Sequence, residues 1–100
     1  MQEKKKEKQA AEQTADRYAA ALSYQPGRDE APRVTAAGRG ELARTIREMA
    51  EAHGVPVYED AGLAKTLYRL GVNTEIPPEL YEAVAQVLVF VARLDKKTSP

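Results

Sequence analysis

The sequence has no cysteine and only one histidine, His53, among its 100 residues. The lack of cysteine excludes disulfides, thiolate catalysis and the usual structural zinc sites. His53 stands at the predicted end of a helix, where a cation interacts favourably with the helix dipole. No second histidine or cysteine is present to share a metal ion with it. We therefore predict a structural role for His53, no metal site and no cofactor.

Net charge and long apolar runs are also lacking. Fifteen basic residues cancel fifteen acidic ones, so the molecule as a whole has no electrostatic reason to bind nucleic acid or an anionic membrane. The most apolar stretch, AVAQVLVFVA at 83–92, is half of the about 20 residues that a membrane-spanning helix needs. The basic N-terminus is followed by no apolar segment, so it is not a secretory signal. We predict a soluble, cytoplasmic protein with one domain.

The N-terminal segment is highly charged. After Met1, residues 1–13 contain no aliphatic side chain larger than alanine, so they cannot bury enough surface to offset the entropy of ordering. This segment is either a polybasic arm that binds phosphate or lipid, or a solvated linker that is flexible or partly helical. Glu3, Glu7 and Glu12 interrupt the basic charge and favour the linker. Residues 14–95 form the predicted domain, and 96–100 a disordered tail.

The first part of that domain predicts a β-hairpin. Residues 18–24 alternate, and both faces are small or apolar, which is typical of an interior strand. A cluster of turn residues at 25–30 separates it from a second strand at 33–37.

Three helices are predicted in the remainder. The apolar spacing from Leu42 to His53 indicates a helix that Gly54 ends, and residues 55–58 follow as a short strand. A strand, a helix and a strand over 33–58 imply a right-handed parallel crossover. Asp60 is the expected N-cap of the next helix, which Gly71 closes. The predicted fold class is α/β, with a small three- to four-stranded mixed sheet surrounded by helices.

The last predicted helix, at about 78–94, is apolar on nearly every side. It is therefore either covered on most sides or in contact with a partner.

The polar residues suggest no catalytic site. Asp29-Glu30 and Glu59-Asp60 are adjacent carboxylates, but they fall at a predicted turn and a predicted helix cap, where acids are common. Gly38-Arg39-Gly40-Glu41 precedes a helix but lacks the lysine and third glycine of the nucleotide-binding loops. The sequence therefore indicates a non-enzymatic binding module.

Several motifs occur together from Tyr18 onward. They read YAAALSYQPGRDEAPRVTAAGRGELARTIREMAEAHGVPVYED, then LAKTLYRL, then IPPELYEAVAQVLVFVARL. This series resembles the C-terminal cytoplasmic domain of the FlhB/YscU export-switch proteins of flagellar and type III secretion systems, over about four fifths of the chain. In particular, the chain is similar to stand-alone FlhB-like proteins that lack the membrane domain. The resemblance implies a sheet of four strands whose first strand precedes Tyr18, although residues 9–13 suit a strand poorly.

In full-length members of this family the chain cuts itself at Asn-Pro-Thr-His, where the asparagine amide attacks its own carbonyl within a strained turn. The four matching positions are Thr14, Ala15, Asp16 and Arg17. Threonine has no amide to cyclise, and alanine does not fix the turn. The sole asparagine, Asn73, lies in a different loop. The resemblance therefore implies that this chain does not cleave itself, which disfavours the alternative of a self-cleaving specificity switch.

The resemblance also implies a docking patch. Its positions fall on Ala31 and Pro32 before the second strand, and on Ala85 and Leu88 in the last helix. We expect Ala31 and Pro32 to be exposed, whereas Leu88 is either part of this patch or part of the core. The implied function is that of a monomeric component of flagellar or type III protein export. It would dock with early export substrates or the export gate, and could stand in for the cleaved cytoplasmic part of FlhB. The alternative is a nucleic-acid or lipid binder that uses its polybasic tail.

Overall fold

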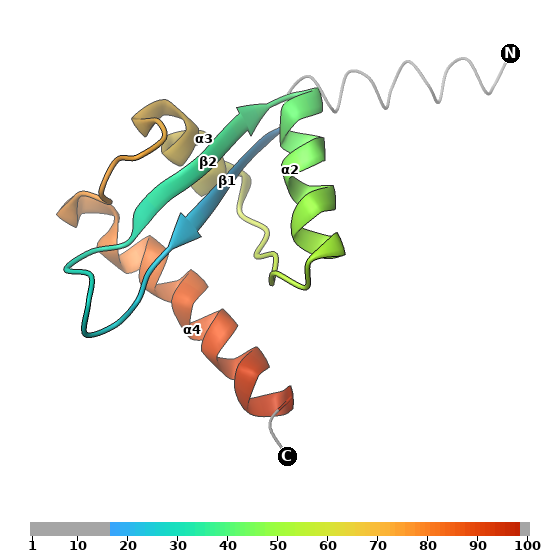
Figure 1. Ribbon diagram of the computed structural model, residues 1–100. Helices are drawn as coiled ribbons and strands as arrows, with labels where there is room; N and C mark the ends of the chain where they lie inside the picture. Colours follow the sequence, from blue (N-terminus) through green and yellow to red (C-terminus); the bar gives the residue numbers. More distant parts are fainter. Residues whose placement is uncertain (1–16, 99–100) are drawn as a thin grey trace, which may run out of the picture.

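A hairpin followed by three α-helices makes up the part of the chain that the computed structural model describes, residues 17–98 (Figure 1). The elements are β1 (Tyr18–Ser23), β2 (Arg33–Arg39), α2 (Glu41–Ala52), α3 (Ala61–Leu70), the short 3-10 helix η1 (Pro78–Leu80) and α4 (Tyr81–Thr98). The α/β class is confirmed. Helix α4 continues through 96–98, which the sequence analysis assigned to a tail, and the predicted tail at 1–13 lies outside the described residues.

The hairpin forms as predicted. β1 pairs antiparallel with β2, from Tyr18 opposite Arg39 to Ser23 opposite Arg33, with one irregularity between Ala21 and Leu22. At its polar tip the Gln25 carbonyl accepts hydrogen bonds from the backbone N–H groups of residues 28 and 29. The Gln25 N–H donates in turn to the Asp29 carboxylate, at 2.9 Å. Side-chain and backbone bonds therefore close the tip.

The predicted sheet of three to four mixed strands is wrong for the described residues, which contain a sheet of two antiparallel strands. Residues 55–58 form no strand, so no parallel crossover exists. Pro56 has no N–H to donate, and the Val55 N–H bonds to the Ala50 carbonyl at the end of α2, at 2.8 Å. The Tyr58 ring packs edge-on against Phe90, with centroids 5.3 Å apart. The strand implied before Tyr18 falls outside the described residues.

Residues 73–76 cover part of the outer edge of β2. The Val34 N–H donates to the Thr74 carbonyl at 3.0 Å, and the Ile76 N–H donates to the Pro32 carbonyl at 2.9 Å. An isolated antiparallel bridge joins Arg33 to Glu75. The connection between α3 and η1 is therefore held against the start of β2.

The helix ends follow the predicted signals. The Asp60 carboxylate accepts a hydrogen bond from the Leu63 N–H at 3.1 Å and caps α3. Gly71 ends α3 with φ at 96°, a conformation that favours glycine. Pro78 stands at the start of η1, where a missing N–H is tolerated.

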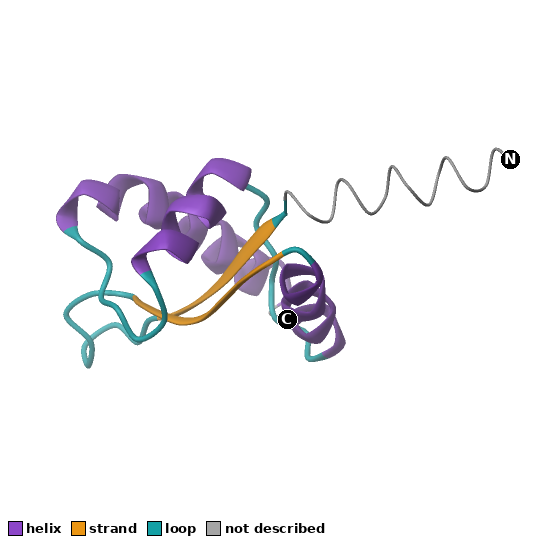
Figure 2. Ribbon diagram, turned by 90° about the horizontal axis from the view of Figure 1, so that it is seen from above, coloured by secondary structure: helices purple, strands orange, loops and turns teal. Residues whose placement is uncertain are grey.

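The core lies between the hairpin and the pair α3 and α4. Its buried residues are Val34, Leu63, Leu67, Ile76 and Val84. Helix α2 packs on the other side of the hairpin, where Ala43 is buried (Figures 1 and 2). A β-carbon on Gly38 would lie 2.5 Å from Leu42 Cγ, so glycine permits this close approach of α2.

Candidate functional site

Three of the four carboxylates singled out in the sequence, Asp29, Glu59 and Asp60, serve local structure. Glu59 forms an ion pair with Arg47, and Asp60 caps α3. His53 stands at the C-cap of α2, where its Nδ1 lies 2.8 Å from the Met49 carbonyl oxygen. Within residues 17–98 no cluster of three or more His, Asp or Glu side chains is arranged to hold a metal ion. Glu59 and Asp60 are therefore engaged in ion pairing and helix capping.

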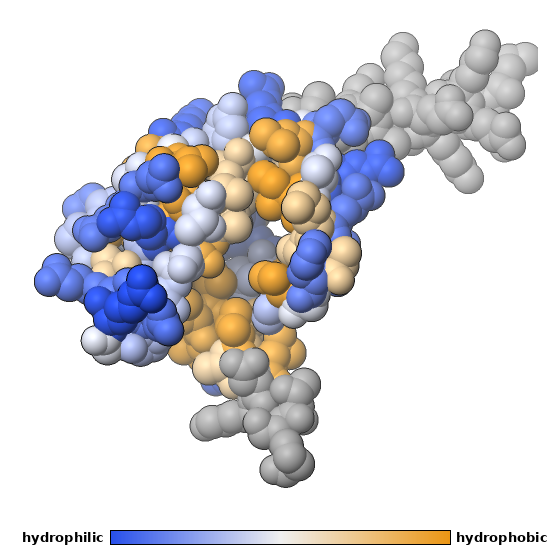
Figure 3. Space-filling view, viewed as in Figure 1, coloured by the Kyte–Doolittle hydropathy of each residue, from blue (hydrophilic) through white to orange (hydrophobic). Residues whose placement is uncertain are grey.

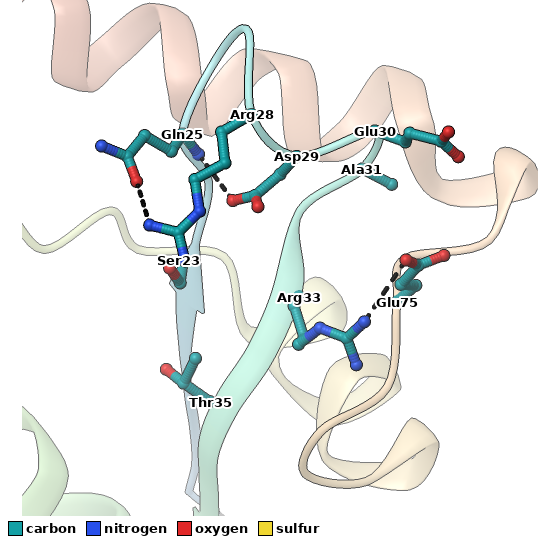
Figure 4. Close-up of a pocket in the computed structure, with 9 residues that line it drawn as sticks. All are labelled: Ser23, Gln25, Arg28, Asp29, Glu30, Ala31, Arg33, Thr35 and Glu75. Atoms are coloured by element: carbon teal, nitrogen blue, oxygen red, sulfur yellow. Dashed lines mark hydrogen bonds and ion pairs between the residues drawn. The ribbon is translucent and has the colours of Figure 1, made fainter.

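A polar pocket of about 440 Å³ lies beside the hairpin tip (Figure 4). Four of its charged side chains, those of Arg28, Asp29, Arg33 and Glu75, point toward neighbours within the pocket, whereas Glu30 points away from them. Arg33 pairs with Glu75 at 3.3 Å, and Arg28 donates to the Gln25 side chain at 3.0 Å. Because these arginines already have partners, the pocket is a network of surface pairs rather than a preformed anion site.

The four residues of the implied docking patch differ in exposure. Ala31 is 7% exposed and Pro32 is also buried, so the expectation that they are exposed is wrong. The Ile76 N–H donates a hydrogen bond to the Pro32 carbonyl, so the connection at 73–76 lies beside Pro32. Ala85 is exposed, whereas Leu88 is half-buried and packs against the core. The structure therefore leaves Ala85, and one side of Leu88, accessible to a partner.

A second apolar surface runs along the outside of α4. Tyr81 is 47% exposed and Val89 is 49% exposed, and Ala85 and Ala92 are exposed between and after them. Spacings of four, four and three residues place these side chains on one helix face. We call the set of Tyr81, Ala85, Val89 and Ala92 the α4 outer stripe. The sequence predicts that α4 is apolar on nearly every side, but it does not distinguish this stripe from the core-facing one.

A larger groove, of about 660 Å³, lies beside β1, and we call it the β1 groove. It is lined by residues 17–22 of β1 and its flank and by residues 55–61, with further side chains from α2, α3 and α4. Figure 3 shows this face hollowed between the hairpin and α2, with hydrophobic residues around the hollow. Leu88 reaches the same groove from α4. The groove was not predicted from the sequence, because residues 55–58 were expected to form a strand of the sheet.

Of the four positions that match the cleavage motif, Arg17 alone lies in the described part of the chain. It immediately precedes β1, and its carbonyl accepts a hydrogen bond from the Gly40 N–H at 2.9 Å. Thr14, Ala15 and Asp16 fall outside the described residues.

No helix within residues 17–98 is both long enough and apolar enough to cross a bilayer.

The fold defines a class of protein, the C-terminal domains of secretion-export components. The PscU C-terminal domain superposes with a TM-score of 0.70 at 36% identity, covering 75% of this chain and 96% of that domain. The cytoplasmic domain of FlhB from Shewanella putrefaciens gives a TM-score of 0.73 at 34% identity, covering 80% of this chain and 66% of that one.

The model of the FlhB HrpN YscU SpaS family matches residues 15–91, and the chain belongs to this family. Protein YlqH of Bacillus subtilis is 44% identical over 85 residues, which are 85% of this chain and 91% of YlqH. The flagellar biosynthetic protein FlhB of Salmonella typhimurium is 42% identical over 80 residues, which are 79% of this chain. The match spans 21% of that FlhB, so it concerns one part of a longer protein. The family resemblance seen in the sequence is thus confirmed.

Proposed function

We propose that this chain is a non-enzymatic, cytoplasmic component of flagellar or type III protein export that docks with export substrates or with the export gate. Its relatives include FlhB proteins of flagellar biosynthesis and HrcU, a hypersensitivity response secretion protein of Ralstonia nicotianae. In this role it would stand in for the cleaved cytoplasmic part of FlhB.

The α4 outer stripe carries this proposal. Soluble domains place isolated apolar residues on their surfaces, but a continuous apolar helix face indicates contact with another protein. The stripe contains Ala85, a position of the docking patch that the family resemblance implies, and Leu88 lies one turn away. An apolar helix face suits a partner that brings its own apolar residues, as in helix-in-groove recognition.

The absence of self-cleavage is the first expected result. With threonine at position 14, no side-chain amide is present to attack the backbone carbonyl, so the cyclisation that cuts the chain has no nucleophile. We expect mass spectrometry to find a single intact species after prolonged incubation at neutral pH. The Thr14→Asn, Ala15→Pro double variant, which restores two motif residues, is the matched comparison. A fragment of the unaltered chain ending at Thr14 would refute the non-enzymatic assignment.

Docking through α4 predicts a second result. We expect Ala85→Asp to weaken capture of an export component from extracts of the native cell by at least about tenfold, which corresponds to about 1.4 kcal/mol. A carboxylate placed in the apolar contact must lose its hydration without gaining a partner. Quantitative pull-down with the immobilised full chain measures the effect.

Gln86→Asp provides the control for this substitution. Gln86 is also exposed on α4, and the change adds the same charge outside the stripe. Both variants should melt within a few degrees of the unaltered chain, since neither position is buried. Equal capture by the Ala85→Asp and unaltered chains would exclude the stripe as the docking surface.

A further inference from the structure

Large and small side chains alternate along the α4 outer stripe. In chain order they are Tyr81, Ala85, Val89 and Ala92. All four are exposed, and the two large ones keep about half of their surface open to solvent, 47% for Tyr81 and 49% for Val89. Figure 1 shows the C-terminal end of α4 projecting from the rest of the molecule. The stripe is therefore accessible to another helix over about three turns.

Charges of opposite sign flank the two ends of the stripe. Glu82 directly follows Tyr81, and Arg93 directly follows Ala92. Both charged residues are exposed, and neither has an ion-pair partner within residues 17–98. Glu82 and Arg93 are as far apart in the sequence as Tyr81 and Ala92, a distance of about three helical turns. The two charges therefore lie along the same edge of the stripe, one at each end.

This pattern is complementary to itself when two α4 helices run antiparallel. A two-fold axis between Ala85 and Val89 places Tyr81 opposite Ala92 of the second copy, and Ala85 opposite Val89 of the second copy. Each large side chain then meets a small one, which is the arrangement that lets facing helices interdigitate. The same axis keeps the charged edges of the two helices on one side, because the same patch is used by both copies.

The charges select the same arrangement independently. In the antiparallel pair, Glu82 of each copy faces Arg93 of the other, so two ion pairs form. A parallel pair in register would instead place Tyr81 on Tyr81, Glu82 on Glu82 and Arg93 on Arg93. Like charges directly opposite each other are unfavourable. Side-chain size and charge thus both favour the antiparallel arrangement.

From these features we propose that the α4 outer stripe pairs with the same stripe of a second copy, which forms an antiparallel dimer with two-fold symmetry. Each copy contributes one helix face, and contacts of this kind fall below the about 1,200 Å² that stable complexes bury. The dimer is therefore weak and reversible. The monomer that was expected from the sequence is the form present at low concentration.

The dimer covers the surface proposed above for docking. A copy within the dimer cannot dock with a partner through the stripe, so self-association and docking exclude each other. The dimer does not depend on the export function, because self-association is measured on the purified chain alone. A failure of this proposal would consequently leave the proposed docking in place.

Sedimentation equilibrium of the purified full chain, from micromolar to millimolar concentration, tests the dimer. We expect the data to fit a monomer–dimer equilibrium. Glu82→Arg and Arg93→Glu each replace both ion pairs of the dimer by pairs of like charge, so each should raise the dissociation constant at least tenfold.

Exchanging both charges should reverse this effect. The Glu82→Arg, Arg93→Glu double variant restores two ion pairs with their signs exchanged, and its dissociation constant should be within threefold of that of the unaltered chain. An equimolar mixture of the two single variants should also dimerise, because each end of the mixed dimer then joins one arginine to one glutamate.

Two control variants make the same charge changes away from the stripe. Glu30→Arg lies in the hairpin turn and Arg69→Glu on α3, and both positions are exposed. The dissociation constant should be unchanged in both. Thermal melting checks that every variant is folded. The double variant carries both altered charges near the ends of α4, so its recovered dimerisation would separate the loss of pairing from any loss of helix.

Three results would overturn the proposal. A chain that stays monomeric at millimolar concentration would leave the stripe to a partner protein. A dimer with the same dissociation constant in the unaltered chain and in the single variants would form through another surface. If neither the double variant nor the mixture regained the affinity lost in the single variants, Glu82 would not face Arg93 of the second copy.

Discussion

Ile76→Ala should lower the free energy of unfolding by about 2 to 5 kcal/mol, the range for truncating a large aliphatic side chain in a core. Ile76 is 2% exposed and packs with Val34, Leu63, Leu67 and Val84. Truncation removes its contacts with the hairpin and with two helices at once, and these elements cannot all move to close the cavity. Urea denaturation followed by circular dichroism should show a lower midpoint with an unchanged slope.

Val72→Ala is the matched control for this substitution. Val72 lies in the same connection between α3 and η1 but is 49% exposed. Its truncation should change stability by less than about 0.5 kcal/mol, as is usual for surface positions. If both variants had the same stability, Ile76 would not be part of the core.

Gly38→Ala should destabilise the protein by about 1 to 3 kcal/mol, because it overpacks the contact between the hairpin and α2. The added β-carbon would lie 2.5 Å from Leu42 Cγ and 3.0 Å from Leu42 Cβ. The Cβ atom is fixed by the backbone of α2, so a change of rotamer cannot relieve the whole clash. Thermal and urea denaturation of the single variant measure the cost.

Two comparisons separate this clash from a general effect of replacing glycine. Gly62→Ala should be neutral or stabilising, because its added β-carbon would meet only an Asp60 carboxylate oxygen at 3.7 Å and alanine favours the helix. Adding Leu42→Ala to Gly38→Ala removes the Cγ and Cδ2 atoms and should recover most of the lost stability. Strictly additive costs in the double variant would contradict the proposed contact.

Local sequence signals predicted those parts of the fold that local chemistry decides. Asp60 and Gly71 marked the two ends of α3, because a side-chain cap and a positive φ depend on single residues. The cluster of turn residues at 25–30 likewise predicted the hairpin, since its tip closes through bonds among near neighbours.

Features that depend on distant contacts were not predictable in this way. Residues 55–58 have the composition of a strand, yet the Val55 N–H bonds to α2 and the Tyr58 ring packs on α4. Pro32 follows a polar turn and was expected on the surface, but it is buried, and its carbonyl accepts a hydrogen bond from the Ile76 N–H. In both cases the deciding partner lies elsewhere in the chain, where no local pattern indicates it.

The same distinction between local signals and distant contacts applies to the candidate site. The apolar character of α4 on nearly every side was evident from the sequence and led to the expectation of a partner. Which apolar residues face outward depends on how α4 packs against α3 and the hairpin. The structure assigns Val84 to the core and Val89 to the surface, although both are valines in the same helix.

Photocrosslinking in the native cell tests the docking function most directly. A photoreactive amino acid at position 85 lies in the α4 outer stripe, and one at position 48 lies on the exposed face of α2, away from the stripe. Our account predicts a crosslink to an export substrate or export-gate protein from position 85 and none from position 48. Crosslinks of equal yield from both positions, or crosslinks from position 85 only to proteins unrelated to export, would contradict it.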